Sequence, residues 1–321
     1  MLGEFRRRLE EYEGSLIIGV AGDSGSGKST FTKSIINLLG KDLVSSFSLD
    51  DYHTEDRETR KKTGHLPLDP KINNLKLAAE HLSALQKGNA IIKPVYNHKT
   101  GKFDPPEVFE PKKIVIVEGL HTLYDELRNY LDLKIYVDPS KDIKWLWKIK
   151  RDVEERGYKK EDVIKEIRAR EPFYKRYIDF QKIYADIVIK IDISKFSEED
   201  SYSVETILKV LDFPLSGIEM PLSLSSLINT SQKPMMISYR DDFYYMKRVS
   251  RITFDGLIPH EAIDSLERRI MEYTGFENYI LERSKYVNGT QIAQLLVAWY
   301  FVEMMNNIFR EIENAREKNI Y

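Results

Sequence analysis

The sequence predicts an α/β fold in which a mostly parallel, doubly wound sheet is followed by a smaller α+β domain. Up to about residue 192, short apolar runs alternate with amphipathic stretches. Apolar strands that alternate with helices form parallel sheets covered on both faces. After residue 192 this alternation gives way to β-rich segments and two helices. We therefore expect one domain over residues 1–192 and a second over 193–321.

The strands predicted for the first domain are short apolar runs over residues 15–22, 43–49, 112–121, 131–138 and 185–193. Four segments with helical spacing of apolar residues lie between them: 29–40, 73–88, 142–157 and 159–178. The last of these contains Pro172, where we expect a kink. Residues 90–106 are predicted to form a strand and a turn, with the bend at Gly101.

The second domain is predicted to hold short antiparallel strands over 234–240, 243–249 and 250–256, and helices over 260–275 and 289–318. The final helix is apolar on most of its circumference up to Phe309, which indicates a buried helix. We expect no membrane span, because no apolar run approaches the roughly 18 residues that are needed.

Composition excludes several kinds of function. Of the 321 residues, 42% are apolar and 31% are charged, as in a packed globular protein, and the net charge of −2 argues against a general nucleic-acid binder. The chain has no cysteine, which excludes disulfides, thiolate nucleophiles and cysteine zinc sites. Its first residues, MLGEFRRRLEEYEGS, lack the apolar core of a signal peptide, so we expect a cytoplasmic protein.

Residues 22–29, GDSGSGKS, fit the phosphate-binding pattern G-x-x-x-x-G-K-[ST] between a predicted strand and a predicted helix. Backbone N–H groups of such a loop surround phosphates, Lys28 reaches the β- and γ-phosphates, and the Ser29 hydroxyl binds Mg²⁺. We expect ATP to contact Gly22, Asp23, Ser24, Gly25, Ser26, Gly27, Lys28, Ser29 and Thr30. The loop alone fits GTPases, ATPases and small-molecule kinases. No Asn-Lys-x-Asp motif occurs, which disfavours a GTPase.

A kinase also needs a base for the acceptor hydroxyl and a carboxylate for the metal. Asp50 and Asp51 directly follow the predicted strand 43–49, at the strand end where open α/β sheets bind ligands. The alternative for this pair is a helix cap or a solvated turn. Glu118 ends an apolar strand and suits Mg²⁺ or its bound water, although a surface strand end would look the same.

The third requirement is mobile positive charge over the transferred phosphoryl group. Arg151 and Arg156 precede Gly157, which separates two predicted helices. Two helices around a glycine hinge would form a lid. A solvated charged face is the alternative for such a run.

In chain order, the phosphate-binding loop, LDDYH, PVYNH, VEGLH, KRDVEERG and QKIYADIVI together resemble the phosphoribulokinase/uridine kinase family of P-loop kinases. Within it, DDYHTEDRETRKKTG, YNHKTG and EGLHTLYDE are similar to the plant and cyanobacterial phosphoribulokinase branch. RITFDG and NGTQIAQLLVAWYF resemble the extra domain of that branch. Plant-type members carry a cysteine in the loop where this chain has Ser26, so a thiol switch is impossible here.

The resemblance implies ATP- and Mg²⁺-dependent phosphorylation of the 1-hydroxyl of ribulose 5-phosphate, in a carbon-fixing or related route, by a homodimer. It makes Asp50 the catalytic base and Glu118 a second essential carboxylate and metal ligand, with Ser29 on the metal. Lys28, Arg151 and Arg156 complete the implied catalytic set, and the sugar phosphate is assigned to His53, Arg57, Arg60, Tyr96 and His98. Asp51, Lys61 and Lys62 keep open roles.

Two alternatives remain at this point. One is a uridine- or cytidine-type nucleoside kinase, and the other is a nucleotide-sensing or assembly ATPase without a small acceptor. Ribulose 5-phosphate carries a dianionic phosphate that suits guanidinium groups, whereas uridine is neutral. The cations after Asp50 therefore favour the sugar phosphate.

Overall fold

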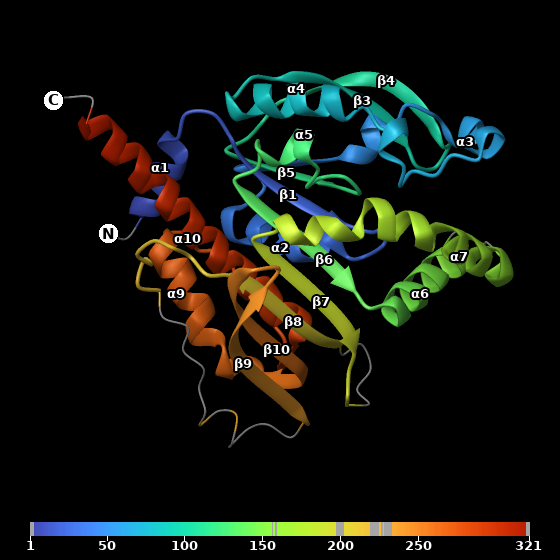
Figure 1. Ribbon diagram of the computed structural model, residues 1–321. Helices are drawn as coiled ribbons and strands as arrows, with labels where there is room; N and C mark the ends of the chain where they lie inside the picture. Colours follow the sequence, from blue (N-terminus) through green and yellow to red (C-terminus); the bar gives the residue numbers. More distant parts are fainter. Residues whose placement is uncertain are drawn as a thin grey trace. The chain divides into compact units, whose positions relative to one another are not determined.

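The computed structural model describes residues 3–155, 157, 159–196, 202–218, 225, 227 and 233–318 (Figure 1). The chain forms two compact units. The first, here called the P-loop unit, comprises Glu13–Lys28 and Leu43–Lys190. The second, the C-terminal unit, comprises Met1–Tyr12, Ser29–Asp42 and Ile191–Tyr321. The chain passes from the P-loop unit to the C-terminal unit after residue 190, and residues 1–12 and 29–42 also group with the C-terminal residues.

The P-loop unit has a parallel sheet, as predicted. Strand β1 (Leu16–Gly22) pairs in parallel with β5 (Ile114–Gly119) and β6 (Leu133–Pro139), and β2 (Val44–Ser48) pairs in parallel with β5. With β7 (Ile187–Ile193), the strand order is β7–β6–β1–β5–β2. Every residue of β1 is buried. Because β1, β2 and β5 are parallel neighbours, their carboxyl ends meet at one edge.

The helices of this unit are η1 (Leu49–Tyr52), α3 (Arg57–Thr63), η2 (Pro70–Ile72), α4 (Leu75–Gln86), α5 (Asp125–Arg128), α6 (Lys141–Lys150), the π-helical turn η3 (Arg151–Glu155), α7 (Lys160–Tyr177) and η4 (Asp179–Tyr184). A hairpin of β3 (Ile91–Asn97) and β4 (Lys102–Phe109) bends at Gly101, as predicted (Figure 1). The Asn74 side chain caps α4 by accepting from the Leu77 N–H, and α7 runs through Pro172.

The C-terminal unit contains α1 (Glu4–Glu11), α2 (Lys28–Leu39), β8 (Tyr202–Lys209), β9 (Met235–Tyr244), β10 (Lys247–Pro259), η5 (His260–Ala262), α9 (Asp264–Thr274), β11 (Tyr286–Asn288) and α10 (Gly289–Lys318). Strand β10 pairs antiparallel with β8, β9 and β11. The strand predicted over 243–249 is wrong, because Tyr245 and Met246 have positive φ and form the two-residue turn between β9 and β10.

Helix α2 is attached to residues far along the chain. Lys33 pairs with Glu282 at 2.7 Å, and Asn37 donates a hydrogen bond to the Ile280 carbonyl at 2.8 Å. The Gln294 side chain donates to the Thr30 carbonyl at 2.6 Å. The helix that begins in the phosphate-binding loop is therefore held by α10 and by the segment before β11.

Helix α10 is buried, as its sequence predicted. It packs against β8 and β10 within the C-terminal unit. Among the described residues it is the one helix long and apolar enough to cross a membrane, contrary to the prediction that no segment would reach that size. Its most apolar 18-residue window is 83% buried inside the protein, as in the core helix of a globular domain.

Candidate active site

The phosphate-binding loop follows β1 and has the backbone geometry of a phosphate cradle. Gly22, Gly25 and Gly27 have φ of 153°, 76° and 82°. A Cβ at Gly22 would lie 2.6 Å from the Val137 carbonyl oxygen and 2.7 Å from the Ser26 hydroxyl oxygen, so no larger residue fits there. The sequence motif thus corresponds to a backbone that can turn its N–H groups inward around a triphosphate.

Lys28 is folded back over this loop. Its ammonium donates hydrogen bonds to the carbonyls of Asp23 at 2.9 Å and Gly22 at 3.2 Å. Burial lowers the pKa of Lys28, while the charges of Asp50 and Glu118 act in the opposite direction. The lysine predicted for the phosphates therefore lies in the electrostatic field of both predicted carboxylates.

Asp50 and Asp51 have different environments. Asp51 Oδ2 accepts a hydrogen bond from Lys93 at 2.8 Å, and its Oδ1 accepts one from the Tyr96 backbone N–H at 2.8 Å. The side chain of Asp50 is 31% exposed and faces His53 at 3.8 Å and His98 at 3.5 Å. Asp51 is thus committed to fixing β3, whereas Asp50 is available for a ligand.

The protonation of His53 follows from its neighbour Asn73. The Asn73 amide nitrogen donates to the carbonyls of Pro67 at 3.1 Å and Asp69 at 2.8 Å, which orients its oxygen toward His53 Nδ1 at 2.7 Å. Nδ1 therefore carries a proton. Burial lowers the pKa of His53, although Asp50 opposes the shift. The neutral ring presents Nε2 as an acceptor on the side of Asp50.

The cations that follow in the sequence divide into two groups. Arg57, the first residue of α3, donates to the His98 carbonyl at 2.6 Å. Arg60 donates to the Tyr96 hydroxyl at 2.6 Å and to the Glu55 carbonyl at 2.9 Å. Lys62, by contrast, is exposed and paired with Glu58 at 2.7 Å. Arg57 and Arg60 thus hold residues that were predicted to bind the acceptor, and Lys62 belongs to the solvated face.

Glu118 lies in the sheet between the two other predicted parts of the site. In β5 it is paired in register with Val20 of β1 and Ser48 of β2. Ser48 in turn caps η1 by accepting from the Asp50 N–H at 3.2 Å. The strand order thus brings Glu118 between the phosphate-binding loop and the Asp50 turn.

Arg151, one of the two arginines predicted for a lid, lies close to the phosphate-binding loop. A Cβ at Gly25 would lie 2.7 Å from Arg151 Nη1. Asp152, which is 1% exposed, holds Arg151 at 2.9 Å and Lys148 at 2.9 Å. Arg156, the second predicted lid arginine, lies outside the described residues. At Gly157, φ is 71° and no atom of the described residues lies within 4 Å of an added Cβ.

Sequence reasoning missed Arg170 and Asp152. Arg170, in α7, pairs with Asp23 of the loop at 3.0 Å and is 11% exposed. Its sequence context, a charged helix face, gives no sign of this contact. Asp152 lies within KRDVEERG, and its position directly after Arg151 was the one feature of the sequence that could have indicated its contact with that arginine.

A pocket of about 580 Å³ opens beside these residues. Seven cationic side chains line it, against the three carboxylates of Asp152, Asp162 and Glu166. The cations are Arg57, Arg60, Lys61, Lys148, Arg151, Lys159 and Arg170. Such an excess of positive charge favours phosphate groups.

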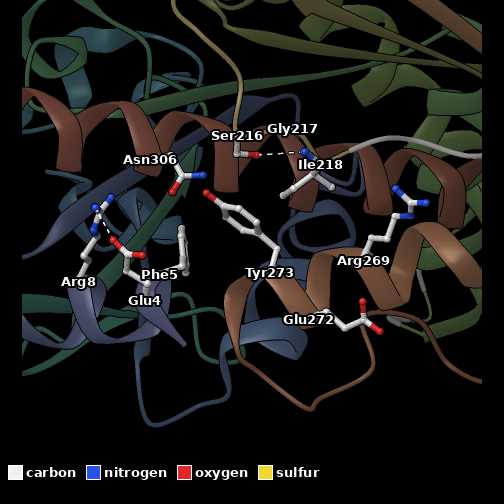
Figure 2. A pocket seen from close by; sticks show the side chains of 10 residues that line it. All are labelled: Glu4, Phe5, Arg8, Ser216, Gly217, Ile218, Arg269, Glu272, Tyr273 and Asn306. Carbon is white, nitrogen blue, oxygen red and sulfur yellow. Dashed lines mark hydrogen bonds and ion pairs between the residues drawn. The ribbon is translucent and has the colours of Figure 1, made fainter. Parts of the chain in front are cut away.

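A second pocket, of about 550 Å³, lies in the C-terminal unit (Figure 2). Its lining balances Arg8 and Arg269 with Glu4 and Glu272, and Arg8 is paired with Glu4 at 2.6 Å. Figure 2 shows Tyr273 projecting into the space between α1 and α10. This balanced lining lacks the excess of cations found in the pocket of the P-loop unit, so we place the phosphate chemistry in the P-loop unit.

A phosphate-binding loop, carboxylates at the adjacent strand ends and a cation-lined pocket define a P-loop kinase. The model of the phosphoribulokinase/uridine kinase family matches residues 17–194. The chain belongs to this family.

Relatives within the family include phosphoribulokinases and uridine kinases. A phosphoribulokinase of Synechocystis sp. is 48% identical over 185 residues, 57% of this chain and 56% of that protein, so the match spans just over half of the relative. A chloroplastic phosphoribulokinase of Chlamydomonas reinhardtii is 31% identical over 96% of this chain and 88% of its own length. A uridine kinase of Clostridium novyi is 38% identical over 54% of this chain and 86% of its own length.

The solved phosphoribulokinase from Rhodobacter spheroides has the same fold. It superimposes with a TM-score of 0.55 at 22% identity, over 81% of this chain and 96% of its own. The predicted fold, a parallel P-loop kinase domain with an added α+β part, is thereby confirmed.

Proposed function

We propose that this protein transfers the γ-phosphoryl group of ATP to the 1-hydroxyl of D-ribulose 5-phosphate, giving ribulose 1,5-bisphosphate and ADP. The observation that carries the proposal is the position of Asp50: it is half-buried, faces two histidines and belongs to the same unit as the cation-lined pocket. His98 lies next to Asp50 and accepts a hydrogen bond from Arg57, which lines the pocket, so a base is linked to a strongly cationic cavity. This arrangement suits an acceptor that is itself a phosphate ester.

In the proposed mechanism, Asp50 accepts the proton of the 1-hydroxyl as its oxygen attacks the γ-phosphorus. The bond between the γ-phosphorus and the bridging oxygen breaks, and ADP leaves. Lys28 and Arg151 offset the charge that develops on the transferred group. His53 Nε2 is a hydrogen-bond acceptor, so it suits a hydroxyl of the sugar better than a phosphate oxygen. Arg57 and the neighbouring cations would bind the phosphate instead.

We assign Mg²⁺ to Ser29 and Glu118, with ATP on residues 22–30. The oxygen donors of both side chains suit this hard cation, and the glycine cradle fits a triphosphate. When bound, Mg²⁺ would neutralise charge on the β- and γ-phosphates.

Two further observations bear on the substrate. The uridine kinase match covers about half of this chain, whereas the Chlamydomonas phosphoribulokinase match covers nearly all of it. Uridine also has no phosphate to meet the seven cations of the pocket. A nucleoside kinase is therefore the second candidate.

The deciding experiment couples ADP release to a spectrophotometric readout with ribulose 5-phosphate, uridine or no acceptor. Turnover with the sugar phosphate alone supports the proposal. Turnover with uridine alone would replace it with a nucleoside kinase, and ADP release that needs no acceptor would indicate an ATPase. Lys28→Met serves as the control, since it should abolish transfer to either acceptor.

We also propose that the protein is a homodimer. On β9, the aromatic side chains of Tyr239 and Phe243 are 63% and 66% exposed, and Met246 in the adjoining turn is 95% exposed. Exposed aromatic side chains on a strand that pairs on one side only favour association. Light scattering on wild type and on Tyr239→Arg/Phe243→Arg tests this: the double variant should be monomeric, and a monomeric wild type would refute the proposal.

A further inference from the structure

Three possible metal ligands gather where β10 leads into α9. His260 begins the turn η5 directly after β10, and Asp264 and Glu267 lie in the first turns of α9. Residues three apart on a helix share one face. One ligand atom from each of the three side chains lies within 4.8 Å of the other two.

Two of these side chains are buried without the hydrogen bonds they need. His260 is 6% exposed, and neither ring nitrogen has a hydrogen-bond partner among the described residues. Glu267 is fully buried; its Oε1 accepts from the Leu281 N–H at 2.8 Å, but its Oε2 has no hydrogen-bond partner in the part of the chain that the structure describes. Buried polar atoms almost always have a hydrogen-bond partner. Atoms without one in two side chains that lie next to each other in space therefore call for an explanation.

The spacing of these atoms matches metal ligands better than a hydrogen bond. His260 Nε2 and Glu267 Oε2 are 3.5 Å apart, beyond the usual range for N–H···O contacts. Two ligands about 2.1 Å from a tetrahedral ion are about 3.4 Å apart. The third carboxylate, Asp264, is fixed by Arg283 at 2.8 Å and by Arg268, as outer partners commonly orient metal ligands.

We propose that His260, Asp264 and Glu267 bind one divalent transition-metal ion, with Zn²⁺ as the best fit. One imidazole nitrogen and two carboxylates suit Zn²⁺, whereas Mg²⁺ prefers oxygen ligands alone. Through Glu267 Oε1 and Leu281, the ion would join the end of β10, the start of α9 and the segment before β11. Its role would be to stabilise the C-terminal unit. This proposal is independent of the phosphoryl acceptor.

The test measures Zn²⁺ binding to the full chain after chelator treatment, with Mg²⁺ present in excess to occupy all-oxygen sites. Wild type should bind one equivalent and melt several degrees higher with Zn²⁺. Glu267→Gln keeps the shape and the acceptor for Leu281, yet should weaken binding by roughly 100-fold or more. Glu272→Gln, an exposed carboxylate on the same helix, is the matched control and should bind like wild type.

Cobalt provides an independent readout. Co²⁺ in place of Zn²⁺ should give visible absorption of a low-coordinate site in wild type, and the band should be lost in His260→Gln. If Glu267→Gln does not fold, Asp264→Asn, which alters a less buried ligand, takes its place. The proposal is overturned if wild type binds no Zn²⁺ or if the ligand variants bind Zn²⁺ as tightly as wild type. His260 and Glu267 would then be a buried pair without a metal ion.

Discussion

Lys93 Nζ lies 2.8 Å from Asp51 Oδ2, and the two side chains are only 6% and 13% exposed. This ion pair separates the roles of two adjacent aspartates. Asp51 neutralises the buried ammonium of Lys93 and accepts a hydrogen bond from the Tyr96 N–H, so both of its carboxylate oxygens already have partners. Asp50, one residue earlier, has histidines but no cation within ion-pair distance among the described residues.

The first prediction contrasts these two residues. Asp50→Asn should reduce kcat by about 10²–10⁴ while ATP binding and thermal stability stay near wild type, because it removes a general base. Asp51→Asn should lower the free energy of unfolding by about 1–3 kcal/mol, because Lys93 then loses its buried carboxylate partner and is paired with the exposed Glu107. Steady-state kinetics and urea unfolding on both variants measure these effects. Full activity of Asp50→Asn would exclude it as the base.

The second prediction concerns Arg57. Arg57→Ala should raise KM for the sugar phosphate by about 10- to 100-fold, because one charge-assisted hydrogen bond contributes about 1.5–3 kcal/mol. KM for ATP should change little. Lys62→Ala, whose lysine is exposed and paired with Glu58, is the control. If Arg57→Ala changed KM for the sugar phosphate and KM for ATP equally, Arg57 would not be part of the sugar-phosphate site.

The third prediction uses the contact between the loop and Arg151. Gly25→Ala should lower kcat, because its methyl group would lie 2.7 Å from Arg151 Nη1 and displace the guanidinium. The backbone strain of alanine at positive φ adds a cost of about 1 kcal/mol. Gly3→Ala has the same φ problem but open space, so it should reproduce the strain without the kinetic defect. A wild-type kcat for Gly25→Ala would contradict a role for Arg151 in transfer.

The fourth prediction is a pH dependence of stability. Burial lowers the pKa of His121 to about 4, and its Nε2 donates to the Leu68 carbonyl at 2.9 Å. Below about pH 6.5, His121 is protonated in the unfolded chain but stays neutral in the folded chain. The free energy of unfolding therefore decreases as the pH is lowered from about 6.5 to about 4. The loss attributable to His121 is about 3 kcal/mol.

Urea unfolding at pH 7 and pH 4.5 measures this loss. His121→Gln can still donate to Leu68 but does not titrate, so its stability should depend less on pH than that of wild type. An unchanged pH dependence in this variant would assign the effect to other groups, with His53 as the next candidate because its pKa is lowered too.

The sequence predicted the fold well where local and global signals agree. The strand before the loop is apolar throughout and the helices stop at glycines, so β1, α2 and α4 follow from pattern alone. The hairpin of β9 and β10 was missed because its turn uses Tyr245 and Met246, which rarely adopt positive φ. Helix α3 was also missed, since it buries no residue and has no apolar period.

The candidate site was predictable in its parts but not in its pairings. Adjacent carboxylates cannot show which one is neutralised, because Lys93 is 42 residues away from Asp51. The Arg170–Asp23 contact spans 147 residues and leaves no local trace. The tautomer of His53 depends on two backbone carbonyls that orient Asn73. Such relationships arise only from tertiary structure.

The anchoring of α2 has a consequence for the timing of folding during synthesis. Asn37 leaves the ribosome about 240 residues before its partner Ile280. At about 5–20 residues per second, this interval is roughly 10–50 s. The helix that completes the nucleotide cradle therefore lacks its supports until most of the chain has been made. A nascent chain can form the central strands early, but this helix gains its tertiary contacts only near the end of translation.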